Sequence, residues 1–256
     1  MKINAASAVV PVATHEVALE EISSGLADPV LGTIGMEKVQ LCPQHAGRIG
    51  EALVARLMEQ YPTTEFRLHA SPKLSGMTSR IVHLSNAREH PEYVQEALRL
   101  NRIMRAGGYS LHAGRRCEGS MESMLDALEE IEQKAGFPVA VEGLYPERGD
   151  IWLMSNWEEH EMVARRGLRY ALDLSHLNIV SRVHGRRDDL VREMLSSKNC
   201  IEIHVSDNDG RSDAHQPIIG QGTPWWLEML EAAGDHADIF YEGILVDPRR
   251  SRRPPQ

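Results

Sequence analysis

The sequence predicts an α/β protein built as a single (β/α)8 barrel, and three observations lead to that prediction. The chain has 256 residues, and one such barrel ordinarily uses about 250 residues as a single domain. Short apolar runs alternate with amphipathic stretches, which is typical of parallel strands joined by helices. Most of these runs end on a histidine or an acidic residue, and parallel barrels carry their functional residues at the carboxyl ends of the strands.

Seven strands are predicted from about residue 36 onward. They span residues 38–41, 65–69, 109–112, 138–142, 169–173, 201–204 and 239–242. An eighth strand is expected at residues 7–12, before a helix over His15–Ser23. Eight strands close a barrel, whereas six or seven would favour an open sheet, so the barrel prediction depends on this first strand.

Helix signals stand between the predicted strands. Ser120 is a candidate N-cap, Glu122 complements the positive end of that helix, and Gly136 ends it. Pro224 occupies the first position of another predicted helix, which Gly234 closes. These signals support helices that connect one parallel strand to the next.

The chain divides into three predicted segments. Residues 1–35 are expected to form the first β/α unit, residues 36–246 the barrel body, and residues 247–256 a basic, flexible tail. Little sequence follows the last predicted strand, so we expect a shortened C-terminal end without a full closing helix. The flank that this leaves open could be covered by a second copy of the chain or by a partner chain.

Composition excludes several classes of protein. The formal net charge is −9, which argues against the strongly basic surface of a typical nucleic-acid-binding protein. The three cysteines form no CxxC pair, so neither a disulfide framework nor a thiolate zinc site is indicated. The apolar stretch 8–12 is too short to span a membrane and contains Pro11. We therefore expect a cytoplasmic protein that makes no use of a membrane.

Metal-competent side chains stand at the predicted strand ends. A DxxH pair and a DxH pair add three further residues, and the full set of nine is His69, His112, Glu142, Asp173, His176, His204, Asp213, His215 and Glu242. Nitrogen and carboxylate ligands without thiolates suit Zn²⁺, Mn²⁺ or Fe²⁺. Nine ligands exceed what one ion needs, so we predict two or three divalent ions per chain.

These residues resemble a known superfamily. The segment 201–222, IEIHVSDNDGRSDAHQPIIGQG, is similar to the strand-and-loop signature of the xylose isomerase-like TIM barrels, and the resemblance covers roughly residues 36–245. That superfamily includes endonuclease IV, a family 2 AP endonuclease, together with sugar and sugar-phosphate isomerases and epimerases. In endonuclease IV-like proteins nine side chains hold three zinc ions, and the nine residues above follow the same order along the chain.

The resemblance implies more than one chemistry. In the isomerases and epimerases, residues matching Glu142, Asp173, His204 and Glu242 hold one ion while the two glutamates exchange a proton with a sugar. In the nuclease, several ions deliver a hydroxide to a phosphodiester, and Glu142 would orient it. A third reading is an iron site that activates O₂. A fourth is a non-catalytic subunit that depends on a partner.

We favour a sugar, a sugar phosphate or a similar polar small molecule as the substrate. DNA is disfavoured because the chain is acidic and because loop 70–80 has no aromatic residue to insert into a duplex. The predicted catalytic residues are Glu142, Glu242 and His176. The predicted substrate-binding residues are Arg211, Trp152 and Arg115.

Overall fold

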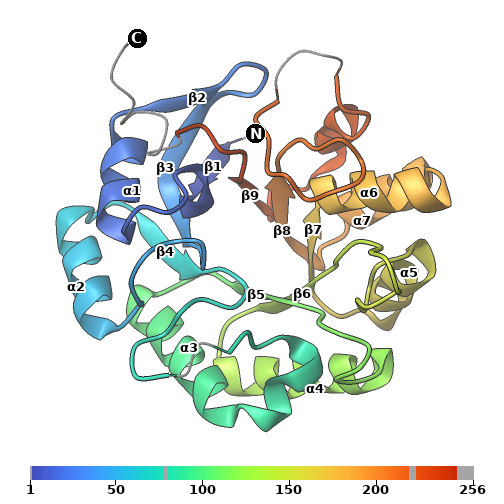
Figure 1. Cartoon of the computed structure of the whole chain (residues 1–256), viewed down its shortest axis with the longest axis horizontal. Coiled ribbons are helices and arrows are strands. Elements are labelled where there is room, and N and C mark those ends of the chain that lie inside the picture. Colours follow the sequence, from blue (N-terminus) through green and yellow to red (C-terminus); the bar gives the residue numbers. More distant parts are fainter. Residues whose placement is uncertain (1, 78–79, 219–222, 247–256) are drawn as a thin grey trace.

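A ring of parallel strands forms the centre of the molecule, and helices surround it (Figure 1). The structure is a computed structural model that describes residues 2–77, 80–218 and 223–246. The eight strands of the ring are β1 (Ile3–Ala6), β3 (Gly32–Leu41), β4 (Glu65–Leu68), β5 (Tyr109–His112), β6 (Val139–Glu142), β7 (Tyr170–Asp173), β8 (Cys200–Val205) and β9 (Asp238–Tyr241). The predicted α/β barrel architecture is therefore confirmed.

The strand order follows the chain around the ring. β1 pairs in parallel with β3 and with β9, and parallel ladders continue from β9 through β8, β7 and β6 to β5. On the other side β3 pairs with β4. An isolated bridge between His69 and Ser110 joins the end of β4 to β5, and Ala70 N donates to Ser110 O at 3.1 Å. All carboxyl ends of these strands therefore lie at one mouth of the ring.

The first strand lies at Ile3–Ala6, so the prediction of a strand over residues 7–12 is wrong. Ser7–Val9 instead forms a buried 3₁₀ helix, η1, and Cys42 N donates to Ser7 Oγ at 2.9 Å. Ala8, Val9 and Val10 of the apolar run that suggested a strand are buried after the end of β1, whereas Val12 is exposed. A short apolar run can adopt either state, because periodicity does not separate a buried strand from a buried helical turn.

An antiparallel hairpin precedes the second strand of the ring. β2 (Leu26–Asp28) pairs with the first residues of β3, which begins at Gly32 rather than at the predicted residue 38. Buried Asp28 holds this hairpin in place. Its Oδ1 accepts from Val30 N and Leu31 N, and its Oδ2 accepts from Ile218 N and Tyr241 Oη. The carboxylate thus ties the hairpin to the loop after β8 and to β9.

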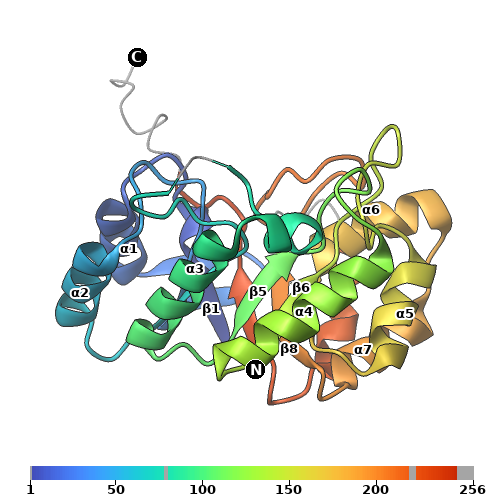
Figure 2. The same cartoon turned by 90° about the horizontal axis from the view of Figure 1, so that it is seen from below.

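Helices cover the outside of the ring, and the longer loops lie along the upper side in Figure 2. The α-helices are α1 (His15–Ser23), α2 (Glu51–Gln60), α3 (Pro91–Met104), α4 (Met121–Ala135), α5 (Trp157–Arg166), α6 (Leu174–His184) and α7 (Asp188–Ser196), and the remaining 3₁₀ helices are η2 (Leu84–Glu89) and η3 (Leu227–Ala232). Ser120 caps α4 by accepting from Ser123 N, and Gly136 ends it in the left-handed conformation, as predicted. None of the helices in the described ranges could span a membrane.

The helix predicted from Pro224 to Gly234 is shorter than expected and is not an α-helix. It is the 3₁₀ helix η3 over Leu227–Ala232. After β9 the chain turns back across the mouth, where Leu245 N and Val246 N both donate to Val9 O. The predicted basic tail, residues 247–256, lies outside the described residues.

Charged side chains fill the end of the ring opposite the functional mouth. Arg67 of β4 is buried and its guanidinium contacts Glu65 Oε1 at 2.9 Å, Glu202 Oε2 at 3.2 Å and Asp238 Oδ2. The guanidinium also lies 5.1 Å from the centre of the Phe240 ring. The guanidinium therefore contacts carboxylates from three strands, and Lys38 Nζ supports it with contacts to Asp238 Oδ1 at 2.7 Å and Glu65 Oε2 at 3.9 Å.

Substitution of this arginine should destabilise the fold. Arg67→Met removes the guanidinium from buried Glu202, and breaking a buried pair in this way typically costs about 3–5 kcal/mol in the free energy of unfolding. The matched control is Arg56→Met, whose ion pair with Glu16 is solvent-exposed and should contribute less than about 1 kcal/mol. Urea unfolding of both variants measures the difference, and equal losses would contradict the assigned role.

Candidate metal centre

Six of the predicted ligands stand at the carboxyl ends of successive strands. His69 follows β4, His112 ends β5, Glu142 ends β6, Asp173 ends β7, His204 lies near the end of β8, and Glu242 follows β9. The other three come from the segments after β7 and β8: His176 lies in the first turn of α6, and Asp213 and His215 lie in the loop after β8. Because the strands are parallel, all nine side chains reach the same mouth of the ring.

A cavity of about 280 Å³ occupies this mouth. Eight of the nine predicted ligands line it, and His204 lies fully buried beside them. The remaining lining comes from the loops after the strands and includes Leu144, Tyr145 and Trp152. The cavity thus has a floor of imidazoles and carboxylates and a partly aromatic wall.

Glu142 lies at the centre of one group of imidazoles. Its Oε1 is 3.4 Å from His204 Nδ1 and 3.5 Å from His112 Nε2, and its Oε2 is 3.9 Å from His69 Nδ1. His69 also reaches across to Glu242, with Nε2 at 3.5 Å from Oε1. One glutamate therefore connects three histidines from three different strands.

A second group forms around His176. Asp173 Oδ1 accepts from Ser175 N and His176 N, so it caps α6 and leaves Oδ2 at 3.5 Å from His176 Nε2. His176 Nε2 also lies 3.3 Å from Asp213 Oδ2. The same carboxylate oxygen of Asp213 is 3.1 Å from His215 Nε2. The DxxH and DxH pairs of the sequence therefore converge on one another.

Two of these imidazoles are oriented by acceptors on the side away from the cluster. His176 Nδ1 lies 2.9 Å from Gly143 O, and His204 Nε2 lies 2.9 Å from Glu202 Oε1. Each contact requires the proton on that nitrogen, which leaves His176 Nε2 and His204 Nδ1 directed at the carboxylates. This arrangement is typical of metal-binding histidines, whose second nitrogen donates to a carbonyl or carboxylate.

Buried polar atoms without partners mark the same place. Five atoms of the predicted ligands are buried and have no hydrogen-bond partner among the described residues: His69 Nδ1, Glu142 Oε2, Asp173 Oδ2, His204 Nδ1 and His215 Nδ1. Such atoms are costly unless something satisfies them. Lone-pair nitrogens and carboxylate oxygens are the donors that a divalent cation requires, so the cluster fits a metal.

Three overlapping sets of side chains could each hold an ion. The sets are His69, Glu142 and His204; Glu142, Asp173 and His176; and Asp173, His204 and Glu242, with the ligand atoms of each set within 4.8 Å of one another. Glu142, Asp173 and His204 each belong to two sets, as bridging ligands would. The number and identity of the ions remain predictions.

The two glutamates differ in their protonation. Burial raises the pKa of Glu242 to about 7, and neighbouring Asp173 and Glu142 add to that effect. Burial also opposes ionisation of Glu142, but the positive charges of neighbouring histidines, His204 first, hold its pKa well below the usual value. Glu142 is therefore an anion over a wide pH range, while Glu242 exchanges a proton near neutrality.

The predicted substrate-binding residues lie in different surroundings. Trp152 lines the cavity, and its Nε1 donates to Glu147 Oε2 at 2.8 Å. Arg115 is not among the lining residues and stacks over the Trp152 ring, with its guanidinium 5.1 Å from the ring centre. Arg211 is exposed on the loop after β8 and does not line the cavity. The structure thus brings Trp152 to the site and leaves both arginines outside its lining.

The residues that support the cluster from below were not predicted from the sequence. Glu202 and Gln40 both contact His204 Nε2, and Ser110 Oγ donates to Glu202 Oε1. A signal was present, because Arg67, Ser110 and Glu202 each stand two positions before a predicted ligand. Alternate residues of a strand face the same side, so these polar residues form the next layer of the ring interior.

Glu202 is a positioning residue in this arrangement. Glu202→Gln should weaken divalent-metal binding by about 10- to 100-fold, because it loses the charged acceptor that orients His204. Competition with a chelating indicator dye measures that affinity. Glu158→Gln, an exposed position on α5, is the matched control. A folded Glu202→Gln variant with wild-type metal affinity would contradict the role.

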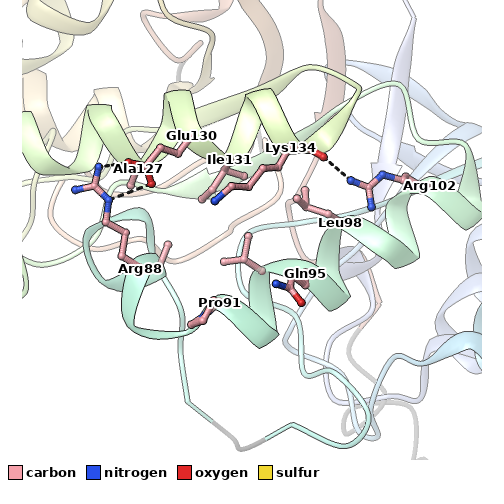
Figure 3. A pocket seen from close by; sticks show the side chains of 11 residues that line it. Arg88, Pro91, Gln95, Leu98, Arg102, Ala127, Glu130, Ile131 and Lys134 are labelled. Carbon is pink, nitrogen blue, oxygen red and sulfur yellow. Dashed lines mark hydrogen bonds and ion pairs between the residues drawn. The ribbon is translucent and has the colours of Figure 1, made fainter.

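A larger groove of about 470 Å³ lies outside the ring, between α3 and α4 (Figure 3). Its lining is largely apolar, and Arg88 at one end is paired with Glu130. None of the candidate metal ligands lines it. The chemistry therefore belongs to the smaller cavity at the mouth.

No family model matches the sequence, and no curated protein is a significant sequence match. Solved structures do share its fold. A D-tagatose 3-epimerase-like protein is 17% identical, with a TM-score of 0.70 over 97% of this chain and 92% of that one. An AP endonuclease, family 2, from Brucella melitensis is 17% identical, with a TM-score of 0.68 over 98% of this chain and 96% of that one.

A xylose isomerase domain protein from Alicyclobacillus acidocaldarius subsp. acidocaldarius is 15% identical, with a TM-score of 0.62 over 97% of this chain and 91% of that one. The chain therefore has the fold of the xylose isomerase-like TIM barrels, as the resemblance implied. At identities this low, the structural similarity establishes the fold alone. One fold can support different reactions.

Proposed function

We propose that this protein is a divalent-metal-dependent isomerase or epimerase that acts on an uncharged sugar or a similar polyol. The observation that carries the proposal is the pair Glu142 and Glu242. Glu142 ends β6 and Glu242 follows β9, and two strands lie between β6 and β9 in the ring. Both glutamates line the cavity. His69 lies between them, with Nδ1 at 3.9 Å from Glu142 Oε2 and Nε2 at 3.5 Å from Glu242 Oε1.

The placement of the two glutamates in the cavity lining suits a proton exchange. Anionic Glu142 accepts a proton from a carbon next to the carbonyl of the sugar, which leaves the substrate as an enediolate. Glu242, in its protonated form, delivers a proton to the opposite face. One proton is taken and one is delivered, so the product is an isomer of the substrate.

The cluster around these glutamates would hold the metal through His69, His204, Asp173 and His176 as well as the glutamates themselves. A divalent ion bound there supplies Lewis acidity to neighbouring oxygens of the sugar. Tyr145 and Trp152 supply aromatic surface for the apolar face of a sugar ring.

The cavity lining favours an uncharged substrate. Among the described residues that line it there is no lysine or arginine. A sugar phosphate or a DNA strand would bring negative charge that recognition sites usually meet with such side chains. A free sugar needs only hydrogen bonds and the metal, so it fits this lining better than a phosphorylated one.

The direct test is hydrogen exchange in D₂O. We expect the Mn²⁺- or Zn²⁺-loaded protein to replace a carbon-bound hydrogen of a free ketohexose, D-tagatose first, with deuterium, and to form the epimer or aldose. Proton NMR measures both changes, and EDTA should abolish them. Exchange confined to sugar phosphates, or to no sugar at all, would contradict the proposal.

A phosphodiesterase that acts on abasic DNA is the second candidate. Three overlapping ligand sets favour it, because such a reaction uses more than one ion. Metal-dependent incision of an abasic duplex, with no exchange on free sugars, would support this candidate instead.

A further inference from the structure

His83 is a buried histidine of the cavity wall to which sequence analysis assigned no role. It lies just before η2, is 5% exposed, and lines the cavity. Its ring centre is 6.0 Å from that of His112 and 5.8 Å from that of Trp152. It therefore stands between the outermost predicted ligand and the aromatic wall.

Glu118 lies beside this imidazole. His83 Nδ1 is buried, has no hydrogen-bond partner among the described residues, and lies 3.7 Å from Glu118 Oε2. Ser85 Oγ donates to the same carboxylate oxygen at 2.8 Å, which fixes the carboxylate in place. A buried ring nitrogen without a hydrogen-bond partner among the described residues leaves the imidazole able to bond a molecule in the cavity.

The backbone around His83 is held closely against the loop after β5. His83 N donates to Asn86 Oδ1 at 2.9 Å, and Ser85 N donates to Ala113 O at 3.0 Å. Gly114, with φ of +104°, allows this approach, since a Cβ there would lie 2.7 Å from His83 Cβ. The backbone therefore holds His83 in the cavity wall.

We propose that the His83 imidazole forms a hydrogen bond with a substrate hydroxyl remote from the carbons that exchange a proton, and that Glu118 positions the ring for this contact. The inference rests on the proposed sugar isomerase or epimerase function. His83 is then a specificity-determining residue, and Glu118 acts through it. A site built to bond a hydroxyl discriminates against an analogue that lacks it, because the site's polar atom is left unpaired.

The test compares a free ketohexose with its 5-deoxy and 6-deoxy analogues on the metal-loaded protein. Titration calorimetry measures binding, and deuterium exchange measures kcat/KM. We expect the wild type to prefer the parent sugar over one analogue by about tenfold or more. His83→Phe should abolish that preference and leave metal content and melting temperature close to wild type. His83→Gln, which can place an amide near Nε2, should restore part of it.

Two further variants sharpen the result. Glu118→Gln should reduce the preference for the parent sugar although the His83 imidazole is still present. His184→Ala, at an exposed position on α6, should leave the preference unchanged. A preference that survives in His83→Phe at the wild-type level overturns this inference alone, as does a wild type that binds all three sugars equally. A wild type that neither binds nor exchanges any free ketohexose overturns both this inference and the proposed function.

Discussion

Glu142→Gln should lower kcat of the metal-dependent reaction by about 10²–10⁴, the range expected when a general base is lost. The substitution keeps the size of the side chain but removes the charge that three histidines surround. It also removes a ligand shared by two of the three candidate metal sets, so bound metal should fall together with the rate. Steady-state kinetics and elemental analysis of the same preparation measure both effects.

The control for this substitution is Glu158→Gln, which makes the same chemical change at an exposed position of α5. We expect wild-type kinetics and wild-type metal content from it. If Glu142→Gln retained both as well, Glu142 could be neither the base nor a ligand.

Removal of the metal should lower the melting temperature strongly. Without an ion, four carboxylates and five imidazoles remain close together in a largely buried cluster, and several of their atoms have no partner among the described residues. A ligand present at about 1,000 times its Kd stabilises the folded state by roughly 4 kcal/mol. For a protein of this size that corresponds to a shift of roughly 8–16 °C.

Scanning calorimetry with excess Zn²⁺ or Mn²⁺ and then with EDTA measures this shift. Metal binding should also release protons. Burial lowers the pKa of His176 and His204, but the negative charges of the neighbouring carboxylates outweigh it and raise both pKa values well above the usual value. Mg²⁺, which prefers oxygen ligands, should stabilise less. An identical melting temperature under all conditions would show that the cluster binds no ion.

Much of the architecture follows from local signals. The helix at His15–Ser23, the Ser120 cap and the Gly136 stop are where the sequence predicts them, because caps and left-handed glycines act within a few residues. The ends of the strands and the residues of the site were predictable for one shared reason. A histidine or carboxylate that closes an apolar run has a packing reason to lie at the mouth of a parallel ring.

The parts that were not predictable depend on contacts distant in sequence. Ser7–Val9 is a 3₁₀ helix because the loop after β3 packs on it through Cys42 N, and no local pattern encodes that contact. Arg211 and Arg115 were predicted to bind substrate because they are close in sequence to predicted ligands. In the structure their loops direct them away from the cavity lining. His83 reached the site through a close approach to Gly114, which spacing along the chain does not reveal.

The most direct test of the central claim is the location and number of bound ions. Crystals of the protein saturated with Zn²⁺ or Mn²⁺ should give two or three anomalous peaks per chain, each within bonding distance of one of the sets built on Glu142, Asp173 and His204. Elemental analysis of the dissolved crystals should give the same number. A single ion would contradict the multinuclear site, and no ion among these residues would contradict the metal centre itself.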